Sequence, residues 1–190
     1  MKNADKNIPV FAISGVKNSG KTTLITQLLP LLSAQGVRIA VVKHDGHDFD
    51  ADVPGTDTYR HLHAGAYGTA IYSDSKYMVV KEKMEKTNAY PDEALFRKWF
   101  PEADLILLEG FKRYPCPKLE VIRRGNSQKS ICKGRYLTAI ATDFPPEEQK
   151  DFPGDIPCLD LNNPQKIAAW VLKHALELSA NFHHDKNRRD

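Results

Sequence analysis

The sequence predicts an α/β fold of three layers, built on a mostly parallel, doubly wound sheet with one added β-hairpin. Short apolar runs recur between helical patterns, and several lack polar alternation, which is typical of strands covered on both faces. A tight turn at Asp74-Ser75 between two strand-like runs predicts the hairpin. A short helix is expected over residues 92–100. The expected strands are residues 10–14, 37–42, 70–73, 76–80, 105–108, 119–123, 137–141 and 156–159.

Two longer helices complete the predicted fold. The first begins at Lys21, carries an apolar stripe and ends near Gly36, a residue that suits a helix C-terminus. Pro30 lies inside it and predicts a kink or an early end, because proline lacks the N–H that would bond to the carbonyl four residues earlier. The last helix has Asn163 as its N-cap and Pro164 at its first position.

Length and composition favour one globular domain. The chain has 190 residues, of which 41% are hydrophobic and 27% charged, close to the average of soluble proteins. We expect this domain over residues 9–180, between flexible tails at 1–8 and 181–190. No apolar run approaches the ~18 to 20 residues of a membrane span, and the N-terminus does not resemble a secretory signal, so a cytoplasmic location is expected. The three cysteines form no C-x-x-C pair and are interpreted as free thiols.

The strongest motif is a phosphate-binding loop after the first expected strand. It matches G-x-x-x-x-G-K-[ST] and opens the first helix, which is the context that the motif requires. Its glycines permit a tight path whose N–H groups point at an anion, and the helix adds its positive dipole end. Lys21 is expected to act as a catalytic residue at the β- and γ-phosphates, and the Thr22 hydroxyl is expected to bind Mg²⁺. The residues expected to bind the nucleotide are Gly15, Val16, Lys17, Asn18, Ser19, Gly20, Lys21, Thr22 and Thr23.

A carboxylate at the end of a neighbouring strand would complete such a site. Glu109 follows the apolar run at residues 105–108, so we expect it at the carboxyl end of a strand as a catalytic acid and magnesium ligand. Gly110 would let the backbone pass close to the phosphates. Asp104 enters the same strand from the opposite end and is the weaker candidate; a solvated charge is the alternative for Glu109.

An aspartate-rich segment follows the second expected strand, between residues 43 and 57. An acidic loop in this position suits a switch that senses the γ-phosphate through Mg²⁺. The candidates are Asp50 as a metal ligand, Asp52 as a catalytic residue, and Asp57. For Asp57 the alternative is a role as N-cap of a following helix.

Histidines in the same region leave a transition-metal site open as an alternative, since imidazole with carboxylate suits zinc or nickel. They occur as His44-x-x-His47 and His61-x-His63. The other interpretation places His44 beside the phosphates as a donor and leaves His61 and His63 in solvent.

A basic stretch and one aspartate are candidates for binding a second ligand or a partner and for recognising the base. Lys112 to Arg135 contains eight basic residues and one acid, Glu120, whereas the whole chain has a net charge of +3, too small to indicate a nucleic-acid surface. The stretch is interpreted either as a docking site for a second anionic ligand or an acidic partner, or as a solvated loop. No N-K-x-D motif occurs, but Thr142-Asp143 offers a carboxylate to guanine; an ordinary loop aspartate is the alternative.

The combination of motifs resembles the MobB family, GTP-binding proteins of molybdopterin-guanine dinucleotide biosynthesis. The segments that carry the resemblance lie within residues 9–178 and are GVKNSGKTTL, VVKHDGHDFDADVPGTDTYRHLHAGA, DLILLEGFK and AIATD. By position, residues 15–23 match the family's nucleotide loop, Asp50, Asp52 and Asp57 its acidic switch segment, and Glu109 its strand-end acid. Family members often have a histidine where this chain has Gly46, which weakens the case for a histidine metal or pterin site.

The resemblance implies a P-loop GTPase fold, a homodimer and weak hydrolysis of GTP with Mg²⁺. It also implies an adaptor role beside the guanylyltransferase and insertion proteins that complete the molybdenum cofactor. The sequence shows no evident glutamine to position water and no arginine finger, so intrinsic turnover of ~10⁻⁴ to 10⁻² s⁻¹ is expected. Two other functions remain open: a P-loop small-molecule kinase, and a non-enzymatic carrier that binds molybdopterin in the basic stretch while GTP only stabilises one conformation.

Overall fold

The computed structural model describes residues 7–46, 48–82, 89–132 and 134–186 and divides the chain into two compact units. The first unit comprises residues 1–44 and 91–190, and the second comprises residues 45–90. Of the predicted tails, residues 1–6 and 187–190 lie outside the described residues, as does His47. None of the described helices is both long enough and apolar enough to cross a bilayer.

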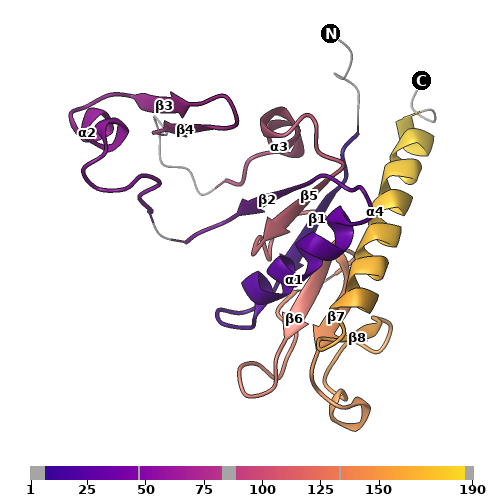
Figure 1. Cartoon of the computed structure of the whole chain (residues 1–190). Helices are drawn as coiled ribbons and strands as arrows, with labels where there is room; N and C mark the ends of the chain where they lie inside the picture. The colour runs from indigo at the N-terminus through magenta and orange to yellow at the C-terminus, as the bar shows by residue number, and fades with distance from the viewer. Residues whose placement is uncertain (1–6, 47, 83–88, 133, 187–190) are drawn as a thin grey trace. The chain divides into compact units, whose positions relative to one another are not determined.

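Six parallel strands form the sheet of the first unit, in the order β2-β5-β1-β6-β7-β8 (Figure 1). The predicted mostly parallel sheet is therefore confirmed, and the strand ends lie within two residues of those expected. The strands are β1 (Val10–Ser14), β2 (Ile39–Lys43), β5 (Leu105–Glu109), β6 (Lys118–Ile122), β7 (Leu137–Thr142) and β8 (Cys158–Asp160).

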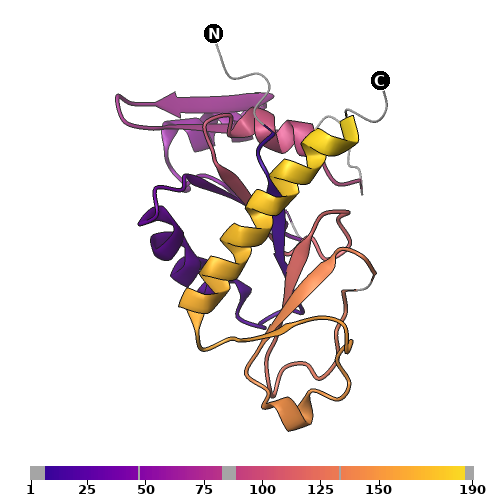
Figure 2. The same ribbon diagram turned by 90° about the vertical axis from the view of Figure 1, so that its right-hand side faces the viewer.

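Two long helices cover one face of this sheet. α1 (Lys21–Ser33) and α4 (Pro164–Lys186) lie side by side and pack their apolar stripes against the central strands (Figures 1 and 2). Alternate residues of β1 point to opposite faces: Phe11 faces the helices, whereas Ala12 faces away, and both are fully buried. Burial on both faces explains why the strand lacks polar alternation.

The ends of these helices test two expectations. The early end at Pro30 is wrong, because α1 continues to Ser33. Leu32 is fully buried beyond the proline, and its burial offsets the loss of one backbone hydrogen bond. The expected cap of α4 is confirmed: Asn163 Oδ1 accepts the backbone N–H of Lys166 at 3.1 Å.

A short helix, α3 (Glu93–Trp99), supports the segment that follows β5. Asp92 caps α3 by accepting the N–H of Leu95 at 2.8 Å. Phe96 of this helix is fully buried and makes an edge contact with Phe111, at a centroid distance of 5.7 Å. The helix thus anchors the chain immediately after the strand-end acid of β5. A 3₁₀ turn, η1 (Pro146–Glu148), lies between β7 and β8.

The second unit contains one helix and the predicted hairpin. β3 (Gly68–Tyr72) and β4 (Tyr77–Lys81) pair antiparallel, and the turn is closed by a hydrogen bond from Ser73 N to the carbonyl of Lys76 at 2.8 Å. The prediction of a hairpin is confirmed. None of the residues of α2 (Asp57–His63) is buried.

Candidate functional site

The phosphate loop joins β1 to α1 through residues 15–20. Gly15 has φ +142°, and a Cβ added there would lie 2.5 Å from the carbonyl oxygen of Val121. Gly20 also has positive φ, at +93°. The loop therefore needs glycine at both ends, for the close approach to β6 and for the turn into the helix.

The first turn of α1 is open for an anion. The first N–H groups of a helix have no intrahelical partner, and no side chain among the described residues caps this helix, so they remain available at the positive end of the dipole. Leu24 donates the first helical hydrogen bond, to Gly20 at 2.9 Å. Ser19 is fully buried, and its Oγ has no hydrogen-bond partner within the described part of the chain. These groups together suit a phosphate.

Lys21 folds back over the loop. Its Nζ donates a hydrogen bond to the carbonyl oxygen of Val16 at 2.6 Å. Burial lowers the pKa of Lys21, Glu109 opposes this effect, and the nearby Lys112 and Lys43 lower the pKa further. A phosphate dianion would favour the charged form of Lys21 and would be a stronger partner for the ammonium group than one carbonyl.

Glu109 meets the loop at the carboxyl end of β5. It pairs in register with Ile13 of β1 and is only 8% exposed. Its Oε1 accepts the hydroxyl hydrogen of Thr22 at 2.5 Å. The structure thus brings together Lys21, Thr22 and Glu109 from two segments 87 residues apart. The alternative of a solvated charge at Glu109 is wrong, because the sheet register buries this residue.

The residues after Glu109 are tightly fixed. Gly110 has φ +91°, and its N–H donates to the carbonyl of Ile13 at 2.9 Å. Ser14 donates its hydroxyl to the carbonyl of Gly110 at 2.5 Å. Phe111 adopts φ +43°, a left-handed conformation that is costly for an aromatic residue. The strand-end acid is therefore held on a rigid support.

The three candidate aspartates all lie in the second unit. Asp50 is exposed. Asp52 accepts hydrogen bonds from the Thr58 hydroxyl and from the N–H of Val53, and the first of these bonds, above all, lowers the pKa of Asp52. Asp52 thus orders the start of α2. Its proposed catalytic role stays a prediction.

The N-cap of α2 is Thr56, whose Oγ1 accepts the N–H of Tyr59 at 3.3 Å. The alternative role of Asp57 as this N-cap is therefore wrong: Asp57 is the first residue of the helix, where its charge favours the dipole. His63 stacks on Tyr59 at a centroid distance of 3.8 Å. Among the described residues, no three His, Cys, Asp or Glu side chains group as a metal site would require.

Asp143 follows β7, as expected. Its Oδ1 accepts the backbone N–H of Arg124 at 2.7 Å, and Arg124 pairs with Glu148 at 2.8 Å. The interpretation of the basic stretch as a solvated loop is wrong for Lys118, because this residue is buried in β6 and donates to the carbonyls of Tyr114 and Cys116. A role for Asp143 in reading guanine remains a prediction.

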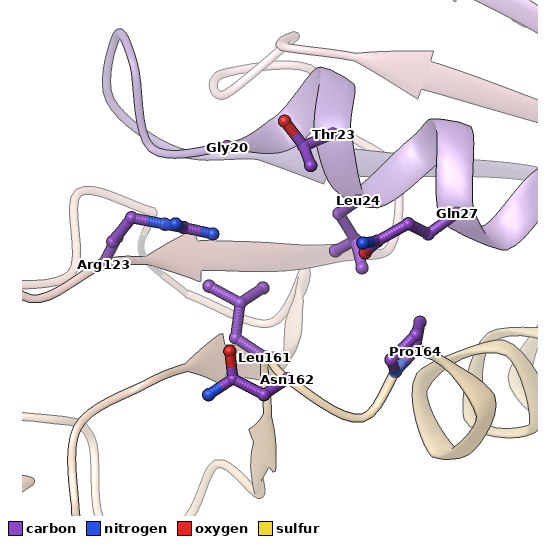
Figure 3. A pocket seen from close by; sticks show the side chains of 8 residues that line it. All are labelled: Gly20, Thr23, Leu24, Gln27, Arg123, Leu161, Asn162 and Pro164. Carbon is purple, nitrogen blue, oxygen red and sulfur yellow. The ribbon is translucent and has the colours of Figure 1, made fainter.

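Two side chains beside the loop were not predicted as part of the site. Arg123 lies against Gly20, and both Arg123 and Asn162 line a cavity beside the start of α1 (Figure 3). Arg123 is one of the eight basic residues of the stretch from Lys112 to Arg135, to which the alternative carrier function assigns the binding of molybdopterin. Arg123 directly follows β6, which neighbours the strand that carries the phosphate loop, and this strand order is visible only in the structure.

Comparison with known proteins shows the family to which this chain belongs. The sequence profile of the family described as "Molybdopterin guanine dinucleotide synthesis protein B", or MobB, matches residues 10–143. The chain belongs to the MobB family. A MobB-family relative from Escherichia coli (strain K12), named "Molybdopterin-guanine dinucleotide biosynthesis adapter protein", is 32% identical over 168 residues, covering 87% of this chain and 93% of its own length. A Haemophilus influenzae relative of the same name is 30% identical, covering 88% and 89% of the two chains.

Solved MobB structures share the fold. Bacillus subtilis MobB has a TM-score of 0.67 and 26% identity, covering 87% of this chain and 96% of its own. A MobB homologue from Bacillus stearothermophilus has a TM-score of 0.63 at 20% identity, covering 88% and 98%. These similarities confirm the expected P-loop NTPase-like α/β fold and the resemblance found in the sequence.

Proposed function

We propose that this protein binds GTP with Mg²⁺, hydrolyses it slowly and acts as an adaptor in the biosynthesis of molybdopterin guanine dinucleotide. The observation that carries the proposal is the hydrogen bond between Thr22 and the buried Glu109 at the mouth of the phosphate loop. It supports a triphosphate site, because these are the hydroxyl and acid that such a site uses together. The adaptor role rests on the names of the relatives, which match most of the chain.

The residues at the mouth of the loop fit Mg²⁺. Hydroxyl and carboxylate oxygens are the ligands that this ion prefers, and it usually keeps only one or two protein carboxylates beside phosphates and water. Thr22 and Glu109 would hold the ion. The role of Asp50 as a metal ligand stays a prediction. When bound, Mg²⁺ neutralises charge on the phosphates. Lys21 would exchange its bond to Val16 for the terminal phosphates.

Slow hydrolysis is expected because the sequence offers no evident glutamine to position water and no arginine clearly placed as a finger. A buried acid that accepts a hydrogen from Thr22 orients the loop, but it does not by itself activate water. A P-loop protein without a water-positioning glutamine and an arginine finger turns over at about 10⁻⁴ to 10⁻² s⁻¹. We propose the same range here. A small-molecule kinase would instead transfer phosphate to an acceptor at ~1 to 100 s⁻¹, which separates the two functions.

We also propose that the protein forms a homodimer through its hairpin. Tyr72 and Tyr77 pair across the two strands and are 82% and 75% exposed, and Val79, on the same face of the hairpin, is 63% exposed. A two-stranded hairpin is marginal by itself, and its free edges present unpaired backbone groups. A second copy offers the same apolar surface, so the two hairpins can cover each other symmetrically. In the pathway, we propose that the guanylyltransferase and the molybdenum-insertion proteins are the partners.

One titration series tests the proposed function. GTP, ATP and the guanylylated pterin are each titrated calorimetrically into the purified protein, with and without Mg²⁺. The expected result is one site per chain that prefers GTP and tightens with Mg²⁺. Equal affinity for ATP would contradict the guanine preference. Tight binding of the pterin without any binding of GTP would favour the carrier function instead.

A further inference from the structure

A cavity of about 160 Å³ lies beside the N-terminus of α1 (Figure 3). Its walls include Thr23 and Gln27 of α1, Arg123 after β6 and Asn162 after β8. Sites for whole small molecules usually measure ~300 to 1,000 Å³. This cavity therefore suits one part of a larger ligand whose remainder lies elsewhere.

Arg123 is the one charged side chain among the residues that line this cavity, and it lies against the phosphate loop. A Cβ added at Gly20 would be 3.1 Å from one terminal nitrogen of the guanidinium. Its Nε is buried and has no hydrogen-bond partner among the residues that the structure describes. A buried donor on a charged group is costly when it is unpaired. The guanidinium therefore has bonding capacity for a ligand at this place.

The direction of a bound nucleotide follows from two consecutive threonines. Thr22 bonds to Glu109, which marks the side of the metal and the terminal phosphates. Thr23 is the next residue of the helix, about 100° further round its axis, and it lines the cavity. Glu109 occupies the side of Thr22, whereas the cavity opens on the side of Thr23, so the nucleoside end of a bound nucleotide has room there.

We propose that this cavity holds the nucleoside of the bound nucleotide and that Arg123 makes the protein select nucleotides over bare polyphosphate. The inference rests on the proposed nucleotide binding. A guanidinium can lie over the face of a base or donate to its acceptor atoms and to the ribose. Arg123 is thus a binding residue for the nucleoside rather than for the phosphates.

The other polar groups of the cavity agree with a nucleoside. Thr23, Gln27 and Asn162 are neutral and offer both donors and acceptors. Amide side chains of this kind match the mixed donor and acceptor edges of a base. A cavity for a second anion would instead be expected to add further cations to Arg123. The lining residues therefore favour a base and its sugar.

The test compares GTP with inorganic tripolyphosphate, which has the phosphates but no nucleoside. Calorimetric titrations use the full-length wild-type protein and Arg123→Met, both with Mg²⁺. We expect Arg123→Met to weaken the affinity for GTP by at least roughly ten-fold, because a hydrogen-bonded charge is lost. The affinity for tripolyphosphate should change by less than about two-fold. An equal loss for both ligands would overturn the inference by assigning Arg123 to the phosphates, as would an unchanged affinity for GTP.

Two further variants protect this comparison. Asn162→Ala changes an exposed loop residue on another wall and should show the same selective loss of GTP, so the test does not depend on the folding of one variant. Arg124→Met removes the next arginine, which pairs with Glu148, and should leave the affinities for GTP and tripolyphosphate unchanged. A wild-type protein that binds neither ligand would contradict nucleotide binding itself, which is a different outcome from equal losses in Arg123→Met.

Discussion

The two units of the chain bury their apolar side chains very differently. In the first unit every residue of β1, β5 and β6 is buried, and α1 and α4 pack over the sheet. In the second unit α2 has no buried residue, and most residues of the hairpin are exposed. A strand becomes stable mainly by burying apolar surface. The first unit therefore provides a rigid support for chemistry, whereas the second presents a surface suited to a partner.

This contrast predicts that nucleotide binding and self-association can be separated by mutation. Changes at the phosphate loop should affect the nucleotide and leave the oligomeric state intact. Changes on the hairpin should do the reverse. A variant that altered both properties equally would show that the two units do not act independently.

The largest expected effect is that of Lys21→Ala. Removing the ammonium group leaves the terminal phosphates without their principal charge partner, so GTP affinity should fall by at least roughly 100-fold. Calorimetric titration measures the loss, and gel filtration should show an unchanged oligomeric state. Lys150→Ala, which removes an equal charge at an exposed position, serves as the control. Unchanged GTP affinity in Lys21→Ala would defeat the assignment of the loop.

The second effect concerns the hairpin. Val79 is 63% exposed on β4, and Val79→Asp would place a charge within the proposed dimer contact. Self-association should weaken by roughly ten- to 100-fold, because an unpaired carboxylate loses its hydration there. Sedimentation equilibrium measures the change. Ser75→Asp, in the turn outside the strands, is the matched control and should still associate. GTP affinity should be normal in both variants.

A smaller effect is expected for Glu109→Gln. The amide can still accept a hydrogen bond from Thr22, but it no longer offers a charge to the metal. The gain in GTP affinity on adding Mg²⁺ should shrink by about ten-fold, whereas binding without the metal should not weaken. Asp104→Asn is the control. Asp104 directly precedes β5, at the end of the strand opposite to Glu109, and pairs with Arg38. An unchanged response of Glu109→Gln to Mg²⁺ would remove Glu109 from the metal site.

The smallest effect is a pH dependence of binding. Burial lowers the pKa of Lys21 in the free protein, and bound phosphates would raise it, because they favour the charged form. GTP affinity should therefore be highest below the lowered pKa and should fall as the pH rises through it. Calorimetry in buffers of different ionisation enthalpy should detect proton uptake on binding. Proton release assigned to Lys21 would contradict this sign.

Local patterns explain why much of the fold and part of the site could be predicted from the sequence. The phosphate loop is a continuous motif, so its residues and the start of α1 were available from spacing alone. Glu109 could also be placed, because the carboxyl ends of neighbouring parallel strands meet at one edge of the sheet. Its hydrogen bond to Thr22 agrees with that argument.

Other features depend on packing that spacing does not reveal. The contact between Arg123 and Gly20 follows from the position of β6 beside β1, and strand order is not readable from local periodicity. Lys118 was counted with exposed charges because a charge count ignores that it belongs to a buried strand. Thr56, rather than Asp57, is the N-cap of α2, because its hydroxyl oxygen accepts the N–H of Tyr59.

The most direct test of the central claim is a crystal structure with Mg²⁺ and a non-hydrolysable GTP analogue. We predict that the triphosphate lies in the loop formed by residues 15–22, that Lys21 has left the carbonyl of Val16, and that the ion touches Thr22. A structure in which the analogue is ordered elsewhere, while Lys21 still bonds to Val16, would contradict the account.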